Sequence, residues 1–146
     1  MKPEYALPMA AERLIPQRAP MRLVDRLLSV HEGCGVAESV LPRENMMADG
    51  EGRLDEVAFV EMIAQGYAAF KGYLDLVEGK PAGEGFLVGV RNLEITGRAY
   101  AGDRLLTSIR TVTSFGGFAV VEGIVTRGDE NVASGILKLW LVEDGR

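Results

Sequence analysis

The chain has 146 residues, of which 47% are hydrophobic and 25% are charged. This length and composition predict one domain, residues 1–146, with a sizeable core. Its formal net charge of −5 argues against general binding to nucleic acid. Cys34 is the single cysteine, which excludes an intrachain disulfide and suits a reducing compartment. The opening residues lack the apolar run of a signal peptide, and no segment is apolar for long enough to span a bilayer. We therefore expect a cytoplasmic protein with no membrane partner.

The residues before position 55 predict short extended segments and loops. Residues 1–13 have no strong pattern, and the two prolines of residues 14–21, LIPQRAPM, favour a bent extended segment. Residues 22–30, RLVDRLLSV, allow a helix or a strand, and the strand is our preferred interpretation. Residues 36–41 alternate loosely and predict a second strand. Pro42 then opens a loop, because proline cannot donate to a strand ladder.

Residues 55–76, DEVAFVEMIAQGYAAFKGYLDL, are the longest predicted element, a buried helix. The segment is apolar on nearly every side, which is typical of a helix that the rest of the fold encloses. Asp55 is the expected N-cap, and the helix macrodipole favours Glu56 in the first turn. Two polar residues, Glu61 and Gln65, interrupt this helix one turn apart, and any function has to account for them.

Glu61 and Gln65 share one stripe of the predicted helix with small residues. At about 3.6 residues per turn, Ala58, Ala68 and Gly72 fall on the same side. Bulky residues lie on the opposite side: Phe59, Ile63, Phe70 and Leu74. The pattern therefore predicts a carboxylate and an amide in a groove of small side chains, on a helix that is otherwise built for burial.

After residue 85 the hydrophobic pattern changes from helical to period two, which predicts strands. Four candidates are rich in Val, Ile, Leu and Thr: residues 86–96, 104–114, 118–127 and 132–142. Glycine-containing turns separate them, at Gly102-Asp103, Gly116-Gly117 and Gly128-Asp129. Connections this short favour antiparallel neighbours, so we expect a meander in which successive strands pair. An antiparallel sheet curled around the one buried helix is the simplest α+β arrangement.

Three stretches resemble the hotdog-fold 3-hydroxyacyl-[acyl-carrier-protein] dehydratases, most closely a divergent branch associated with aryl polyene and related lipid pathways. They are Ile15–Arg26 (IPQRAPMRLVDR), Val60–Ala69 (VEMIAQGYAA) and Phe86–Leu106, which includes FLVGVRNLE and the AGDRL turn. The family usually has histidine where Gln17 stands, and its active-site segment is similar to the second stretch. The resemblance implies a hotdog fold, in which an antiparallel sheet wraps around one long central helix. It also implies a dehydratase-like activity in fatty-acid or polyene biosynthesis.

Removal of water from a 3-hydroxyacyl thioester needs a base for the C2 proton, an acid for the departing hydroxyl and donors at the thioester oxygen. With the resemblance, Glu61 is the candidate catalytic acid, and Gln65 is expected to orient it or to bind substrate. Backbone N–H groups near Glu56 and Val57 are expected to polarise the thioester carbonyl. Three further side chains are candidates for the acyl-binding surface: Met46, Met47 and Ala68.

The sequence does not identify the catalytic base. The related dehydratases carry a histidine in an H-x-x-P-G loop ahead of the helix, and the corresponding position here is near Met47. The single histidine, His31, is far from that motif. Asp49 is an alternative base, although loop aspartates more often cap turns.

Other interpretations of these residues stay open. Glu61 is able to pair with Arg53 or Arg91, and Gln65 is more often a structural hydrogen-bonding residue. Two further functions are compatible with the sequence. One is a thioesterase in which the helix carboxylate activates water or attacks the thioester. The other is a non-catalytic acyl-binding subunit that partners a complete dehydratase.

The expected partners are an acyl carrier protein or an acyl-coenzyme A substrate, and a second copy of the chain. The flat apolar run Phe86–Val90 would promote aggregation on an exposed edge, so a homodimer or higher homo-oligomer is expected to cover it. Carrier proteins are generally acidic, which makes Arg18, Arg22 and Arg91 candidate docking residues. No spacing typical of a zinc site or phosphate loop occurs, so no metal or cofactor is expected.

Overall fold

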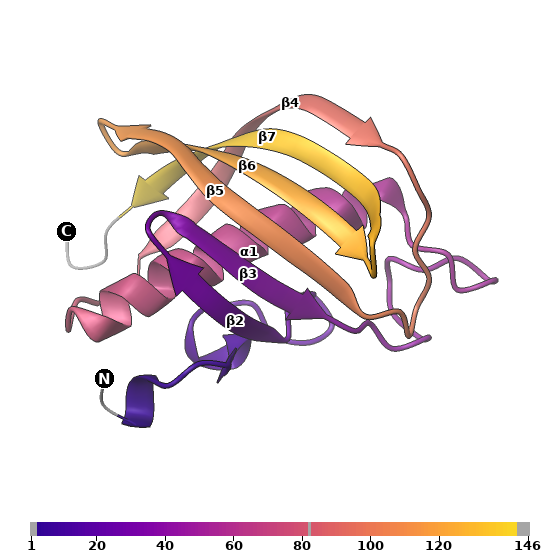
Figure 1. The fold of residues 1–146 in the computed structure, drawn as a ribbon, viewed down its shortest axis with the longest axis horizontal. Helices are drawn as coiled ribbons and strands as arrows, with labels where there is room; N and C mark the ends of the chain where they lie inside the picture. Colours follow the sequence, from indigo (N-terminus) through magenta and orange to yellow (C-terminus); the bar gives the residue numbers. More distant parts are fainter. Residues whose placement is uncertain (1–2, 82, 143–146) are drawn as a thin grey trace.

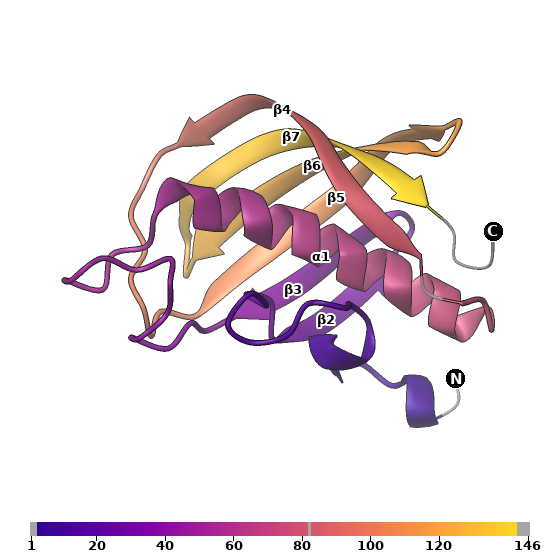
Figure 2. The same cartoon turned by 180° about the vertical axis from the view of Figure 1, so that it is seen from behind.

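The computed structural model describes residues 3–81 and 83–142, in which one long helix lies against a seven-stranded antiparallel sheet. Figure 1 shows the sheet curving over the helix, and Figure 2 shows from behind that the helix lies along the concave face. The strand order is β1-β2-β3-β5-β6-β7-β4, so β4 forms one edge of the sheet. This is the predicted α+β architecture of a sheet wrapped around one central helix.

The sequence periodicity locates most elements well. The helices are α1 (Glu56–Val77) and two short 3-10 turns, η1 (Pro3–Tyr5) and η2 (Ala11–Arg13). The strands are β1 (Met9–Ala10), β2 (Arg26–His31), β3 (Cys34–Ser39), β4 (Glu84–Ile95), β5 (Leu105–Phe115), β6 (Phe118–Arg127) and β7 (Glu130–Val142). The observed bounds of α1 and of the last four strands lie close to the predicted ones.

Local capping sets both ends of α1. Asp55 caps the first turn as predicted, and its Oδ1 accepts a hydrogen bond from the Val57 N–H at 2.9 Å. The helix ends at Val77 and is followed by its C-cap Glu78 and by Gly79, which adopts a φ of +71° that other residues rarely take. Within residues 3–81 and 83–142, no helix has both the length and the apolar character needed to cross a membrane.

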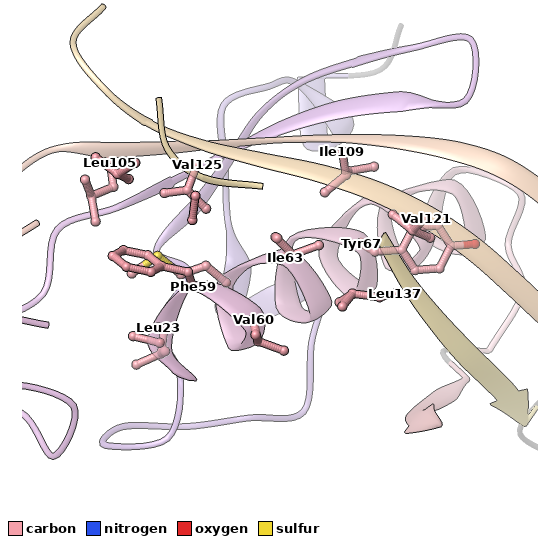
Figure 3. Close-up of a cluster of buried hydrophobic side chains, with 14 of the residues drawn as sticks. Leu23, Phe59, Val60, Ile63, Tyr67, Leu105, Ile109, Val121, Val125 and Leu137 are labelled. Atoms are coloured by element: carbon pink, nitrogen blue, oxygen red, sulfur yellow. The ribbon is translucent and has the colours of Figure 1, made fainter. Parts of the chain in front are cut away.

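The main core fills the space between α1 and the concave face of the sheet, as Figure 3 shows. Phe59 and Ile63 extend from the helix into a cluster with Leu105 and Val125. A Cβ at Gly123 in β6 would overlap the Ile63 side chain, so glycine is what lets the helix lie this close to the sheet. Each of these large buried side chains contributes about 1.5–3 kcal/mol, which makes this layer a principal source of stability.

The N-terminal segment forms a second core with α1. Its buried members come from the N-terminal residues, the first sheet strands and the helix: Met9, Ala11, Leu14, Ile15, Val24, Leu27, Ala37, Ala69 and Tyr73. A Cβ at Gly72 would overlap the carbonyl oxygen of Leu14. Gly72, a member of the small-residue stripe, therefore lets the N-terminal segment approach the helix closely.

In the N-terminal part the start predicted for one strand is wrong, and one short strand was not predicted. The strand predicted over residues 22–30 begins only at Arg26, because the side chain of Gln65 binds the N–H groups of Leu23 and Val24. Those amides are therefore not available to a neighbouring strand. The opening residues, for which no pattern was evident, contain β1, which pairs with β2. Both features depend on residues that are distant in the sequence.

The expected pairing of successive strands is wrong for β4 and β5. In the described residues β4 pairs with β7, whereas β5 pairs with β3 and β6. Residues 96–104 cross between these positions along the loop that precedes α1, where the Ala101 N–H donates to the Gly52 carbonyl at 2.7 Å. The other two glycine turns join paired strands as predicted. A short glycine-containing connection thus predicts a change of direction but does not identify the next partner.

Glu38 in β3 is a buried carboxylate held by two arginines. It is 7% exposed and accepts hydrogen bonds from Arg104 Nε at 2.6 Å and from Arg26 Nε at 2.9 Å. The bond from Arg104 lowers the pKa of Glu38 below its ordinary value of 4.5; burial opposes this effect, and Arg26 adds to it. A lowered pKa in the folded state stabilises the fold above pH 4.5, and that stability is lost as pH falls through the lowered value.

We expect Glu38→Gln to lower the free energy of unfolding by about 1–3 kcal/mol at neutral pH, since hydrogen bonds between charged groups are lost. The variant should also lose less stability than the wild type on acidification. Thermal unfolding over a pH series measures both effects. Glu122→Gln is the control, because Glu122 pairs with Arg110 at an exposed position and should change Tm little. A Glu38→Gln protein with the wild-type Tm at every pH would contradict the prediction.

Candidate functional site

A cavity of about 640 Å³ lies beside α1 and is lined by the predicted carboxylate, Glu61. Its walls come from the N-terminal segment, from α1, and from the sheet near the start of β4 and the end of β7. Along the helix the lining residues include one series with steps of three or four: Glu61, Ala64, Ala68, Lys71 and Asp75. Because that spacing keeps them on one face, a single face of α1 forms one wall of the cavity.

Glu61 is half-buried in the second turn of α1 and has a neutral hydrogen-bonding partner. Its Oε2 accepts from Gln65 Nε2 at 3.0 Å. In the described part of the chain it forms no salt bridge, so neither Arg53 nor Arg91 neutralises it. A carboxylate that is positioned by an amide and borders a cavity is suited to proton transfer, whereas a bound guanidinium would hold it permanently ionised.

Gln65 connects Glu61 to the N-terminal segment. It is 2% exposed, and its Oε1 accepts from the N–H groups of Leu23 at 2.8 Å and Val24 at 3.3 Å. Its Nε2 donates to the Met21 carbonyl at 3.0 Å as well as to Glu61. Both ends of the amide are therefore bound by protein groups. These bonds fix the orientation of Nε2 toward the carboxylate. The geometry makes Gln65 a residue that positions Glu61.

Gln17 is a cavity residue that was not among the predicted site residues. It lines the same cavity as Glu61, and its Oε1 is buried without a hydrogen-bonding partner among the described residues. Buried polar atoms normally have a partner, so an unpaired acceptor beside a cavity marks a place for a ligand donor. A signal was present in the sequence, because Gln17 stands where the resembling family usually has histidine.

The structure divides the other predicted site residues between two places. Ala68 lines the cavity of Glu61, whereas three predicted residues line a second cavity of about 340 Å³ at the start of α1: Met46, Met47 and Glu56. Val57 is 49% exposed, and its N–H is already bound to the capping Asp55. Their roles in substrate binding stay predictions.

Asp49, the alternative base, accepts hydrogen bonds from the backbone N–H groups of Glu51 and Arg53, both at 2.9 Å. It caps the turn ahead of the helix, as loop aspartates often do. Asp49 lines the second cavity and not that of Glu61. His31 has a side chain that is 85% exposed, and it does not line either cavity.

The part of the first cavity away from Glu61 is polar. Lys71 Nζ lies 2.6 Å from Asp75 Oδ1, and the Asp75 side chain is only 9% exposed. Tyr67 borders the same space and is 4% exposed. Burial raises the pKa of the Tyr67 phenol, and the negative charge of Asp75 raises it further, so the phenol stays protonated at neutral pH. We call Lys71 and Asp75 the polar end of the cavity.

A carboxylate-bearing helix beside a cavity, inside a curled antiparallel sheet, defines a hotdog protein. The chain belongs to the ApeP-like family, whose description is ApeP dehydratase and whose sequence model matches residues 9–144. This match confirms the predicted family and the predicted dehydratase-like character. Comparison with curated protein sequences finds no match.

Solved structures confirm the hotdog fold. The dehydratase heterocomplex ApeI:P from Xenorhabdus doucetiae is similar with a TM-score of 0.85 and 18% identity, over 93% of each chain. The uncharacterized protein PH1136 from Pyrococcus horikoshii has a TM-score of 0.65 and 22% identity, over 95% of this chain and 97% of that one. The protein smu.793 from Streptococcus mutans UA159, bound to acetyl CoA, has a TM-score of 0.65 and 13% identity, over 88% and 94%. At these identities the likeness concerns the fold.

Proposed function

We propose that this protein removes water from 3-hydroxyacyl thioesters carried by an acyl carrier protein, as a lyase in fatty-acid or polyene-type biosynthesis. The observation that carries the proposal is the Glu61 carboxylate, which borders a cavity, accepts a hydrogen bond from Gln65 and has no cationic partner in the described residues. Membership of the ApeP-like family supports the reaction class.

One carboxylate suffices for both proton transfers of the proposed reaction. Glu61 accepts the C2 proton, and the electron pair of the C2–H bond passes into the thioester as an enolate. The electron pair then forms the C2–C3 double bond while the C3–O bond breaks. The departing oxygen takes the proton from Glu61 and leaves as water, so the carboxylate is regenerated. Such general acid–base steps typically contribute about 10²–10⁴-fold in rate.

Gln17 has a place in the same proposal as a residue that binds the reacting hydroxyl. Its buried Oε1 is an acceptor without a partner in the described chain, and a 3-hydroxyl group is a donor. A hydrogen bond between them would place the C3 oxygen in the cavity that Glu61 borders. This role accounts for a buried acceptor that the described residues leave unsatisfied.

The proposal is tested by incubating the purified protein with 3-hydroxyacyl chains on an acyl carrier protein and on coenzyme A. Mass spectrometry should detect loss of one water per chain, faster on the carrier protein, while a thiol reagent should detect no free thiol. Release of thiol would instead establish the thioesterase. Acyl binding without loss of water or release of thiol would support the partner subunit, and either result would overturn the proposal.

Docking of the carrier is proposed at Arg91 rather than at all three predicted arginines. Arg18 and Arg22 lie 3.5 and 3.9 Å from carboxylate oxygens of Glu12, and Arg22 also lies 3.9 Å from Asp25. Those carboxylates reduce the attraction that the two arginines exert on an acidic partner. Arg91 lies on the edge strand β4 and forms no salt bridge within the described residues.

We also propose a homodimer that pairs the β4 strands of two copies. β4 is an edge strand on which Phe86 and Val88 are 52% and 53% exposed, a combination that favours pairing with another chain. We expect Val88→Lys to convert the dimer to a monomer in multi-angle light scattering. Val112→Lys is the matched control, because Val112 is 47% exposed but lies on the interior strand β5. A wild-type monomer at micromolar concentration would contradict the prediction.

A further inference from the structure

We infer that the polar end of the cavity selects the terminal group of the acyl chain, and that Lys71 and Asp75 favour a terminal hydroxyl over a methyl or carboxylate group. This inference rests on the proposed function, since it treats the cavity as the acyl-binding site. It concerns a different part of that site from the reacting atoms at Glu61.

The cavity has polar residues at two places along α1 and small residues between them. Glu61 and Lys71 are ten residues apart, which corresponds to about 15 Å along the helix axis. Ala64 and Ala68 lie between them on the same face, and their short side chains leave room for a ligand. The strands that line the cavity contribute apolar side chains, among them Leu87, Leu139 and Leu141. A chain bound at Glu61 by its thioester end and lying along the alanines therefore arrives at the polar end.

The Lys71–Asp75 pair offers both a donor and an acceptor at that position. A lysine ammonium has three donors, and the contact with Asp75 at 2.6 Å uses one of them. The Asp75 carboxylate has acceptor positions beyond the one that Lys71 fills. A hydroxyl group is itself a donor and an acceptor, so it is able to bind both partners. A methyl group would remove water from the charges without replacing the lost hydrogen bonds, which is unfavourable.

The charge around the polar end argues against a carboxylate terminus. Lys71 and Lys80 are the cations that line this part of the cavity, and each is already paired, with Asp75 and with Glu78. Glu84 lines the same part and adds another negative charge. An additional carboxylate would therefore meet more negative than positive charge, whereas a neutral hydroxyl would not.

The test uses 3-hydroxyacyl chains of matched length that end in methyl, hydroxyl or carboxylate. Binding is measured by calorimetry with amide analogues of the pantetheine thioesters, which do not undergo hydrolysis at the thioester position. Turnover is measured in parallel with the thioesters themselves. For chains long enough to reach Lys71, we expect the hydroxyl-terminated analogue to bind at least about tenfold more tightly than either of the others, as one hydrogen bond to a charged group supplies.

Lys71→Met combined with Asp75→Leu replaces the ion pair by apolar side chains of similar size, a change that folds often tolerate. We expect this variant to prefer the methyl-terminated analogue. Lys138→Met is the control, because Lys138 lies over Phe118 and does not line the cavity. Ala68→Leu leaves the ion pair intact and blocks the route to it, so it should remove the discrimination among long chains.

The outcomes separate the inference from the proposed function. The inference is overturned if the wild type binds the methyl-terminated or the carboxylate-terminated analogue as tightly as the hydroxyl-terminated one, or more tightly. This holds even if the protein eliminates water from its substrate. The inference is also overturned if the apolar double variant still prefers the hydroxyl-terminated analogue. If that variant does not fold, the same preference among long chains in Ala68→Leu overturns the inference. Preference for the hydroxyl terminus in binding, without turnover of any thioester, supports the inference and overturns the proposed function.

Discussion

Glu61→Gln should lower the rate of dehydration by about 10²–10⁴-fold, because the amide cannot accept the C2 proton or return a proton to the departing hydroxyl. The substitution keeps the volume of the side chain, and the contact with Gln65 is between neutral groups after the change. We therefore expect Tm to be equal to or higher than that of the wild type, since a half-buried carboxylate is replaced by an uncharged group. Steady-state kinetics and thermal unfolding of both proteins measure the two effects.

Glu84→Gln is the matched control for this prediction. Glu84 is a second carboxylate that lines the same cavity, but it is exposed at the start of β4 and has no hydrogen bond from Gln65. Its neutralisation should leave the rate within a few-fold of the wild type. Full activity of Glu61→Gln would remove Glu61 from the mechanism. Failure of Glu61→Gln to fold would instead identify the carboxylate as structural.

Gln65→Leu should lower the free energy of unfolding by roughly 2–4 kcal/mol, because the buried N–H groups of Leu23 and Val24 lose their acceptor and the change leaves them unsatisfied. In a chain of this length, that loss corresponds to a fall in Tm of roughly 5–15 °C. The N-terminal segment should also become more accessible, which limited proteolysis or hydrogen exchange between residues 14 and 25 would detect.

Gln17→Leu is the control that separates the roles of the two glutamines. Both side chains line the cavity, but Oε1 of Gln17 has no partner in the described chain, whereas Gln65 is bound on both sides. Gln17→Leu should therefore leave Tm nearly unchanged and raise KM for the 3-hydroxyacyl substrate. If Gln65→Leu unfolds at the wild-type temperature, the bonds to Leu23 and Val24 contribute little to stability, and Gln65 acts mainly on Glu61.

Local patterns in the sequence were sufficient to locate the helix and most strands. The N-cap Asp55, the apolar run of α1 and the period-two segments after residue 85 depend on interactions within a few residues, and each lies close to its predicted position. The same helix pattern singled out Glu61 and Gln65, because polar side chains are conspicuous in a segment that is otherwise apolar. The family resemblance, carried by short motifs, was likewise available from the sequence and is confirmed.

Strand order and the complete cavity depended on the tertiary structure. Periodicity shows which face of a strand is buried, but it does not identify the neighbour, so the position of β4 beside β7 was not predictable from its pattern. The bond between Gln65 and the Met21 carbonyl joins residues 44 positions apart, and no local signal pairs the one with the other. Gln17 lines the same cavity as Glu61 because the N-terminal segment is held against α1 by such contacts. The sequence by itself determined which residues have side chains suited to catalysis or binding. Only the folded chain decided which of them share a cavity, because long-range hydrogen bonds and packing bring them together.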